Sequence, residues 1–273
     1  MLLITSVSFI SKHTSLAIYT IHFVFHVSWI WSFTLIKKIF SNYWNFSLHK
    51  IKLWYNEIMN GNYLELNVFF DIIGTIAFAI SGAILGCRKK MDILGVIVLG
   101  LVTALGGGFI RDLVLGITPP KMFQNSTNAI ISTVFSILVF IFYSLKQDFE
   151  NTHWMKFMNK FMIITDTIGL ASFTITGMAT AISLGYDKKF LLIFVGSITG
   201  VGGGMLRDVL AGTIPFIFRE QIYAGACILG ATAFIIARHF CNYQISMVIC
   251  FFAVLIIRLL AVKKNWNLPR IKN

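Results

Sequence analysis

Long apolar runs separated by short polar segments make up the chain from residue 66 to residue 262. Each run is about 18–25 residues long, which is the length that an α-helix needs to cross a lipid bilayer. The pattern therefore predicts an all-α polytopic membrane protein. We expect seven membrane-spanning helices, at 66–87, 93–117, 128–146, 162–185, 190–213, 221–239 and 245–262.

One glycine-rich motif lies inside these apolar runs twice. Its copies are Gly106-Gly107-Gly108-Phe109-Ile110-Arg111-Asp112 and Gly202-Gly203-Gly204-Met205-Leu206-Arg207-Asp208. A glycine in a helix interior costs roughly 0.5–1 kcal/mol relative to alanine, and an ionisable residue inside a membrane span costs roughly 2.5–3.5 kcal/mol. Because the chain carries both costs at two matching places, we expect these residues to be functional.

The two copies belong to a longer duplicated unit. Asp71, Gly74, Phe78 and Gly82 recur 95 positions later as Asp166, Gly169, Phe173 and Gly177, and Gly116 and Pro119 recur 96 positions later as Gly212 and Pro215. Each unit contains three predicted spans, so the second unit must enter the membrane from the opposite side. The predicted organisation is two inverted repeats at 66–146 and 162–239, a seventh helix at 245–262 and a basic tail at 263–273.

The composition agrees with a membrane location and argues against a soluble domain. Hydrophobic residues make up 57% of the chain and charged residues 12%, against roughly 25% charged in soluble domains. The net charge of +12 comes from short Lys and Arg clusters between the apolar runs, which indicate membrane topology rather than a nucleic-acid-binding face. The cysteines have no paired or metal-like spacing. We expect small core side chains at Cys87, Cys227, Cys241 and Cys250.

The basic residues also predict an orientation. Most of them fall on one side of the predicted spans, which we assign to the cytoplasm together with the C-terminus. These residues are Arg88, Lys89, Lys90, Lys146, Lys156, Lys160, Arg219, Lys263, Lys264, Arg270 and Lys272. The opposite side receives Lys121, Lys188, Lys189 and Arg238.

Residues 1–65 form an extension that differs from the rest of the chain. The segment 14–36 is apolar enough to span, but a span there would place the four lysines that follow it outside, against the orientation rule. These lysines are Lys37, Lys38, Lys50 and Lys52. The extension can be an extra helix, an interfacial segment, or sequence that is no part of the functional protein. We favour the last interpretation, with Met59 as the functional start.

We expect a shortened chain that begins at Met59 to retain folding and transport, because the misplaced lysines argue against a span in the extension. Membrane expression, assembly and transport of the shortened and the full chain would be compared. A shortened chain that is expressed but neither assembles nor transports would show that the first 58 residues belong to the working protein.

The triple glycines have two structural interpretations. Neither copy matches a phosphate-binding loop, because both G-x-x-x-x-G-K-[ST] and the G-x-G-x-x-G spacing are missing. Small residues allow helices to pack closely, whereas a kink would open a cavity and expose backbone carbonyls. Three consecutive glycines occupy almost a full turn and cannot all face one neighbour. We therefore favour kinks at Gly106–Gly108 and Gly202–Gly204.

The charged residues of each motif require partners inside the membrane. Adjacent residues point about 100° apart on a helix, so the arginine of a motif is not expected to face the aspartate that follows it. The expected partners are the aspartates in the first turns of the spans, each at the depth of its repeat's arginine and in direct or water-bridged contact. Because intramembrane charges usually mark a water-lined path, we favour such a path over a dry structural pair. The pore-associated charges are thus Asp71, Arg111, Asp112, Asp166, Arg207 and Asp208.

Catalytic and metal-binding patterns are missing from the sequence of the core. The histidines form no i,i+4 pair with a carboxylate, and no Ser-His-Asp or Cys-His constellation occurs there. We expect neither an enzyme nor a metal site or cofactor.

Several segments of the core carry a resemblance to a known family. They are Asp71-Ile-Ile-Gly-Thr-Ile-Ala-Phe-Ala-Ile-Ser-Gly82, the two Gly-Gly-Gly-x-x-Arg-Asp motifs, the Gly-x-x-Pro after each motif, and Arg219-Glu220-x-x-Tyr223. With these segments the chain resembles the prokaryotic branch of the trimeric intracellular cation channel family, over about residues 66–262. That family overlaps a group described as a glycine-transporter domain family.

The resemblance implies seven spans, a homotrimer with one pore per subunit, and permeation of monovalent cations with a preference for potassium. It also implies that the second and fifth spans bend at the glycines to form an hourglass pore. The expected location is a bacterial inner membrane, with the lipid bilayer and monovalent cations as partners and no nucleic acid. A secondary transporter of a small amino acid such as glycine remains the alternative, because inverted repeats with broken helices are at least as typical of transporters.

Overall fold

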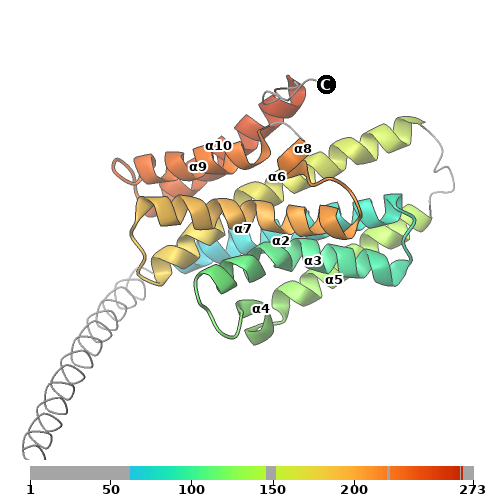
Figure 1. Ribbon diagram of the computed structural model, residues 1–273, viewed down its shortest axis with the longest axis horizontal. Coiled ribbons are helices and arrows are strands. Elements are labelled where there is room, and N and C mark those ends of the chain that lie inside the picture. The colour runs from blue at the N-terminus through green and yellow to red at the C-terminus, as the bar shows by residue number, and fades with distance from the viewer. Residues whose placement is uncertain (1–61, 146–151, 220–221, 265, 267–273) are drawn as a thin grey trace, which may run out of the picture. The chain divides into compact units, whose positions relative to one another are not determined.

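The computed structural model describes residues 62–145, 152–219, 222–264 and 266, and every regular element in these ranges is an α-helix. The helices are α2 (Asn62–Arg88), α3 (Ile93–Val114), α4 (Lys121–Gln124), α5 (Thr127–Ser144), α6 (Thr152–Ser183), α7 (Lys189–Leu210), α8 (Phe216–Arg219), α9 (Tyr223–Ala237) and α10 (Tyr243–Lys263). Figure 1 shows the long helices side by side in one bundle. Nearly all of the extension 1–65 and most of the tail 263–273 lie outside the described residues, as does Lys146.

Each of the seven predicted spans corresponds to one helix. Six of these helices are long and apolar enough to cross a membrane, and the seventh, α9, is a shorter apolar helix of 15 residues. Helix α6 begins ten residues before the predicted span because Met158 and Met162 continue its buried face and pack near Tyr143. The four-residue helices α4 and α8 were not predicted, since four residues are too short to show a helical period. The predicted all-α polytopic fold is confirmed.

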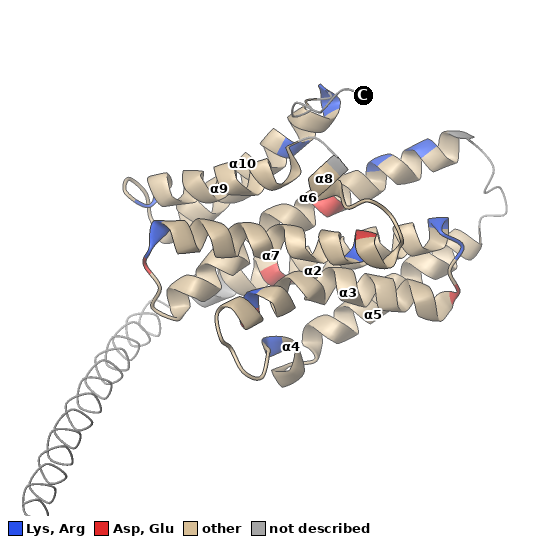
Figure 2. Cartoon of the chain, viewed as in Figure 1, with Lys and Arg blue, Asp and Glu red and all other residues tan. Residues whose placement is uncertain are grey.

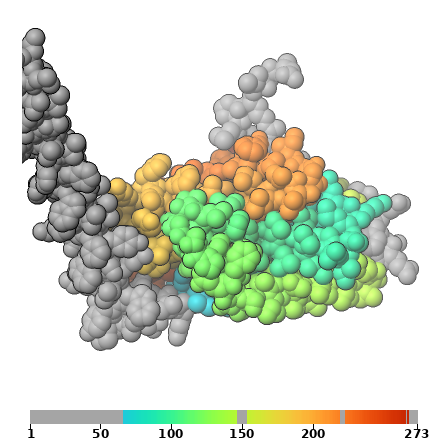
Figure 3. Space-filling view, turned by 60° about the horizontal axis from the view of Figure 1, so that its bottom comes forward, coloured from blue at the N-terminus to red at the C-terminus, as the bar shows by residue number. Residues whose placement is uncertain are grey.

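The helices of the two repeats pack in equivalent ways. Helix α2 packs against α6, and α3 packs against α7. Helix α5 covers α2 and α3, and α9 covers α6 and α7 in the same manner, whereas α10 packs on α9 and α6 and has no counterpart in the first repeat. Figure 3 shows the teal and green segments of the first repeat lying against the gold and orange segments of the second.

The centre of the bundle joins equivalent residues of the two repeats. Phe78 of α2 and Phe173 of α6 contact each other with their ring centroids 5.3 Å apart. A Cβ atom at Gly169 would overlap the ring of Phe78, and one at Gly74 would meet the ring of Phe173 at 3.2 Å. Glycine is therefore required at both positions for the two aromatic rings to meet between the helices.

The two triple-glycine helices end with the same cap. Gly116 follows α3 with φ +69°, and Gly212 follows α7 with φ +64°, a conformation that glycine adopts without steric cost. The amide after each of these glycines donates to the carbonyl of the motif aspartate, at 2.8 Å in the first repeat and 2.9 Å in the second. This is the hydrogen bond of a Schellman motif, so the trailing glycine of each motif ends its helix at a fixed place.

The outer side chains of the bundle suit a lipid environment. Figure 2 shows the helices as largely uncharged over their length. Helices α5 and α10 expose Ile130, Val134, Leu138, Phe142, Phe252 and Ile256. Since six helices can also span a bilayer by length and composition, the chain is a multi-pass membrane protein.

Three of the four cysteines behave as predicted. Cys87, Cys227 and Cys250 are buried, but Cys241 is exposed. It lies in the polar turn between α9 and α10, so the prediction of a core side chain is wrong for this residue.

Candidate functional site

The triple glycines lie where α3 crosses α7. Both helices continue without interruption through their glycines. A Cβ atom at Gly107 would overlap the backbone carbonyl oxygen of Thr199, and one at Gly203 would overlap that of Thr103. These contacts match the close-packing interpretation, in which small residues let two backbones approach. The kink remains a prediction.

The third glycine of each motif faces the charged residues instead of the crossing. A Cβ atom at Gly108 would meet the guanidinium of Arg111 at 3.6 Å. One at Gly204 would overlap the Tyr223 hydroxyl and meet the Asp166 carboxylate at 3.4 Å. The triple glycines therefore face two environments, as expected from their spread around almost a full turn. In each motif the first two glycines lie at the helix crossing, and the third lies beside polar side chains of the charged site.

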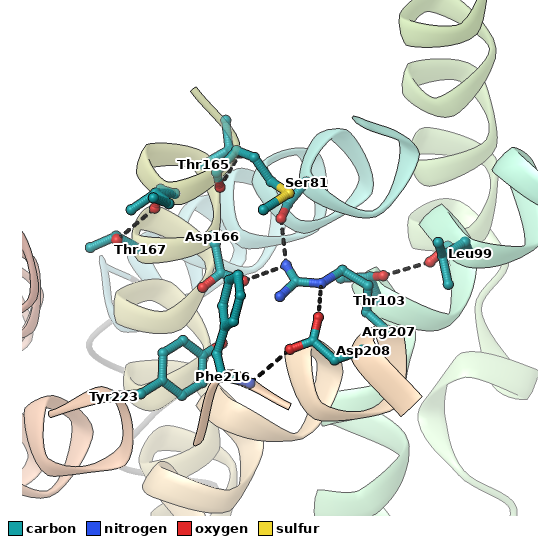
Figure 4. Close-up of polar contacts among 12 residues, drawn as sticks. Ser81, Leu99, Thr103, Thr165, Asp166, Thr167, Arg207, Asp208, Phe216 and Tyr223 are labelled. Carbon is teal, nitrogen blue, oxygen red and sulfur yellow. Dashed lines mark hydrogen bonds and ion pairs between the residues drawn. The ribbon is translucent and has the colours of Figure 1, made fainter. Parts of the chain in front are cut away.

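The charges of the second repeat form a closed cluster, which we call the second charged site (Asp166, Arg207 and Asp208). The guanidinium of Arg207 is 0% exposed. Its Nη1 donates to Asp166 Oδ1 at 2.6 Å and to Ser81 Oγ at 2.6 Å, and its Nε donates to Asp208 Oδ1 at 2.8 Å. Figure 4 shows these three partners grouped around the arginine. The expected direct contact between Asp166 and Arg207 is present.

The motif aspartates also hold the short helices. Asp208 Oδ2 accepts a hydrogen bond from the backbone amide of Phe216 at 2.9 Å, at the start of α8. Asp112 Oδ2 accepts one from the backbone amide of Lys121 at 2.7 Å, at the start of α4. Each aspartate thus joins its own helix to the loop that follows it.

The expectation that the arginine does not face the following aspartate is wrong. Arg111 Nε donates to Asp112 Oδ1 at 2.9 Å, and the second repeat has the same bond. The Cα–Cβ directions of neighbouring residues do differ, but the long arginine side chain folds along the helix surface until its Nε reaches the neighbour. The angle of about 100° between neighbouring side-chain directions therefore does not prevent a long, flexible arginine from contacting the next residue.

The charges of the first repeat border an open space, which we call the first charged site (Asp71, Arg111 and Asp112). Arg111 is paired with Asp112, whereas Asp71 makes no ion pair among the described residues. Asp71 Oδ2 instead accepts a hydrogen bond from Asn128 Nδ2 at 2.6 Å. All three charges line a cavity of about 360 Å³, which is large enough for several water molecules.

The wall of this cavity is mixed in character. Apolar side chains alternate with hydroxyl and amide groups, and its polar residues include Asn67, Asn125, Thr127, Thr176 and Thr180. Asp71 and Arg111 were expected at one depth and in contact. They share the cavity without a direct bond between them.

A lysine adds a positive charge to the same cavity. Lys121 lies in α4, outside the spanning segments. Burial lowers the pKa of Lys121 and the charge of Arg111 lowers it further, against smaller opposing effects of Asp112 and Asp71. Lys121 therefore loses its proton more easily than a free lysine does.

The two charged sites are built on one plan. Asp166 Oδ1 accepts a hydrogen bond from the Tyr223 hydroxyl at 3.4 Å, as Asp71 accepts one from Asn128, and 57 residues separate the members of both pairs. Asn128 and Tyr223 therefore occupy equivalent positions. The sites differ in what surrounds them, because the first borders a cavity and the second is filled by side chains.

Two residues of the second site were missed by the sequence analysis. Ser81 directly precedes Gly82 in the segment that carried the family resemblance, but a serine gave no signal of an arginine partner. Arg258 is 1% exposed in α10, and its Cζ lies 5.1 Å from the centre of the Tyr223 ring. An arginine within a predicted span was a readable signal, because a charged residue is costly there.

Comparison with known proteins gives a consistent result. The sequence profile of a family described as "Glycine transporter" matches residues 68–144 and 163–239, which is one match in each repeat. The inner membrane protein YadS of Escherichia coli (strain K12) is 36% identical over 210 residues, covering 74% of this chain and 94% of that protein.

Solved structures of similar proteins extend this result. A chain from work on conductance through TRIC cation channels is 38% identical, with a TM-score of 0.65, and the match covers 75% of this chain and 97% of that chain. The TRIC trimeric intracellular cation channel orthologue from Rhodobacter sphaeroides is 32% identical, with a TM-score of 0.66 and coverage of 73% and 98%. These matches confirm the family resemblance that the two motif copies predicted.

Proposed function

This chain belongs to the glycine transporter family, and we propose that it forms a cation channel in a bacterial membrane. Each subunit of a homotrimer would contain its own pore, and potassium would be preferred. The observation that carries the proposal is the cavity at the first charged site, which is lined by the Asp71 carboxylate. Within the described part of the chain this carboxylate forms no ion pair. The similarity to solved TRIC cation channels supports it.

Asp71 is the group that would attract the cation. Arg111 is neutralised by Asp112, so its repulsion of a cation is reduced at short range. The Asp71 carboxylate lies next to hydroxyl and amide groups that can replace part of an ion's water shell. With Arg111 paired to Asp112, the Asp71 carboxylate would favour a cation over an anion in this cavity, against the opposing charge of Lys121.

The triple glycines would frame the narrow part of the pore. They lie at the crossing of α3 and α7, between the two charged sites, and bring backbone against backbone without interlocking side chains. Bending or sliding of the two helices at Gly106–Gly108 and Gly202–Gly204 would connect the sites and free carbonyl groups for the ion. The kinks expected from the sequence belong to this conducting state in our proposal.

Single-channel recording from purified protein in a planar bilayer tests this function. We expect unitary current steps, and a reversal potential in a potassium chloride gradient that follows potassium. A carrier of a small amino acid is the second candidate, because the first cavity holds charges of both signs, as a zwitterion requires. Saturable glycine uptake into vesicles without unitary currents would overturn the channel in favour of the carrier.

Replacing Asp71 with asparagine should lower the potassium conductance several-fold and weaken the preference for potassium over chloride. The reason is that the substitution removes the carboxylate that faces the cavity and leaves the charge of Lys121. Asp92→Asn is the matched control, because Asp92 caps α3 through a bond to Gly95 at 2.7 Å, a role that asparagine also fills. Equal conductance of the two variants would contradict a role of Asp71 in permeation.

Replacing Arg111 with glutamine should change the conductance or the gating while potassium stays preferred over chloride. The guanidinium borders the cavity, so its loss changes the local field, but the Asp71 carboxylate remains. Reversal potentials in asymmetric potassium chloride measure the preference. A switch to chloride selectivity would show that Arg111, and not Asp71, governs which ion enters.

A further inference from the structure

The two charged sites have the same arrangement, but they carry different residues at several equivalent positions. Three polar residues that line the first cavity correspond to larger aromatic or aliphatic residues in the other half. Lys121 corresponds to Phe216, because the backbone amides of both donate to the motif aspartates. At the same spacing of 95, Asn128 corresponds to Tyr223 and Thr180 to Leu85.

These replacements fill the space that the first site leaves open. The ring centre of Phe216 lies 5.0 Å from the guanidinium carbon of Arg207. Tyr223 is 2% exposed, and its ring contacts that of Phe216 edge-on with centroids 6.1 Å apart. The second site thus has an aromatic wall where the first has a cavity.

A residue from outside the repeats covers this aromatic wall. Arg258 of α10 lies over the Tyr223 ring, in the cation–π arrangement that holds an aromatic ring in place. Helix α10 has no counterpart in the first repeat. Among the residues that the structure describes, the first repeat therefore has neither an equivalent aromatic wall nor a residue that covers it.

We propose that Phe216 and Tyr223, held by Arg258, close the second half of the conduction path, and that the first half is a permanently hydrated entrance. The inference rests on the proposed channel function. It names the place where the path must open, which is the aromatic wall beside Arg207. It also makes α10 the element that stabilises the closed state.

Thiol labelling tests the closure without any measurement of current. Leu105 lines the first cavity, and Val201, its equivalent in the second repeat, is buried in the cluster that contains Tyr223. Each would be replaced by cysteine in a Cys241→Ser background, which removes an exposed thiol. The probe is a charged, membrane-impermeant methanethiosulfonate. We expect rapid labelling in Leu105→Cys and protection in Val201→Cys.

Exchanging the wall residues between the two sites should expose the cysteine of one half to the thiol reagent and protect the cysteine of the other half. Phe216→Lys with Tyr223→Asn copies the first repeat and should raise the labelling rate of Val201→Cys at least about tenfold, because the reagent no longer needs a local opening of the protein. Tyr223→Phe keeps the ring and should keep the protection. The reciprocal pair Lys121→Phe and Asn128→Tyr should protect Leu105→Cys.

The outcomes separate the closure from the channel function. Rapid labelling of Val201→Cys with the native wall, or a folded exchange variant without any rise, would overturn the closure. If the first exchange variant does not elute as a folded species, the reciprocal pair decides, since unchanged labelling of Leu105→Cys would also overturn it. If the labelling rates change as expected but the protein shows no unitary currents, the aromatic closure is supported and the channel function is contradicted.

Discussion

Replacing Gly203 with alanine is expected to destabilise the folded protein by about 1–3 kcal/mol or more, the range for overpacking a tight interface. The added Cβ atom would overlap the backbone carbonyl oxygen of Thr103 and meet the Phe78 ring at 3.1 Å. A backbone carbonyl cannot rotate away as a flexible side chain can. Helices α3 and α7 would therefore have to separate, which loosens the centre of both repeats.

Gly108 supplies the matched control within the same kind of motif. A Cβ atom there would meet only the end of the Arg111 side chain, at 3.6 Å. Alanine should be tolerated or stabilise the helix by roughly 0.5–1 kcal/mol through its better helix propensity. Thermal unfolding of the purified variants in detergent measures the difference. Equal midpoints for Gly203→Ala and Gly108→Ala would show that the close backbone contact does not limit packing.

The same contact changes what a leucine at these glycines would do. If the helices bend at the glycines, as predicted from the sequence, a leucine at Gly107 or Gly203 would fill the bend and block the path. In the structure both positions face a backbone carbonyl across the helix crossing, so leucine is expected to prevent assembly of the bundle. These leucine variants should therefore yield little folded protein, so their transport could not be measured.

Helix positions and the duplication were readable from the sequence because the bilayer sets a length and glycine and charge are costly within it. The two copies of the motif and of the segment before it indicated a duplication, and the three predicted spans in each unit indicated that the repeats are inverted. Helix α6 was predicted too short, since its first turns carry Lys156 and Lys160 outside the apolar window while Met158 is still buried.

Side-chain partners were less predictable. The bond from Arg207 to Ser81 joins the two repeats across 126 positions of the chain, and only the packing of α2, α6 and α7 brings these residues together. The pairing of each arginine with its following aspartate depends on how a flexible side chain folds, which helix geometry does not fix. The pattern of charges thus predicted which residues form the two sites, but it predicted only some of the partners that they contact.

The different residues at the two charged sites can be read from the sequence, but only the fold shows that they occupy equivalent positions. A lysine at 121 and a phenylalanine at 216 are ordinary loop residues until their amides are seen to bond equivalent aspartates. Their side chains then occupy equivalent places beside an arginine. Inverted repeats therefore let each half serve as the reference for the other.

Replacing Arg207 with glutamine should destabilise the protein far more than the same change at Arg111. Removing Arg207 takes away the guanidinium that pairs with both buried carboxylates, Asp166 and Asp208, and breaking a buried ion pair in this way costs about 3–5 kcal/mol. Asp112 is as buried as Asp208, with 1% of its side chain exposed, but it borders a cavity, so water can fill the space that the Arg111 guanidinium leaves. The two variants occupy equivalent positions, so each serves as the control for the other.

Unfolding midpoints in detergent and the yield of assembled protein measure this difference. A third variant, Arg207→Gln with Asp166→Asn, removes one of the two stranded carboxylates and should recover part of the lost stability, because it lowers the uncompensated buried charge. Similar losses for Arg111→Gln and Arg207→Gln, with no recovery in the double variant, would mean that the second charged site is hydrated. The aromatic closure beside Arg207 would then lose its basis, since a site filled by Phe216 and Tyr223 has no room for that water.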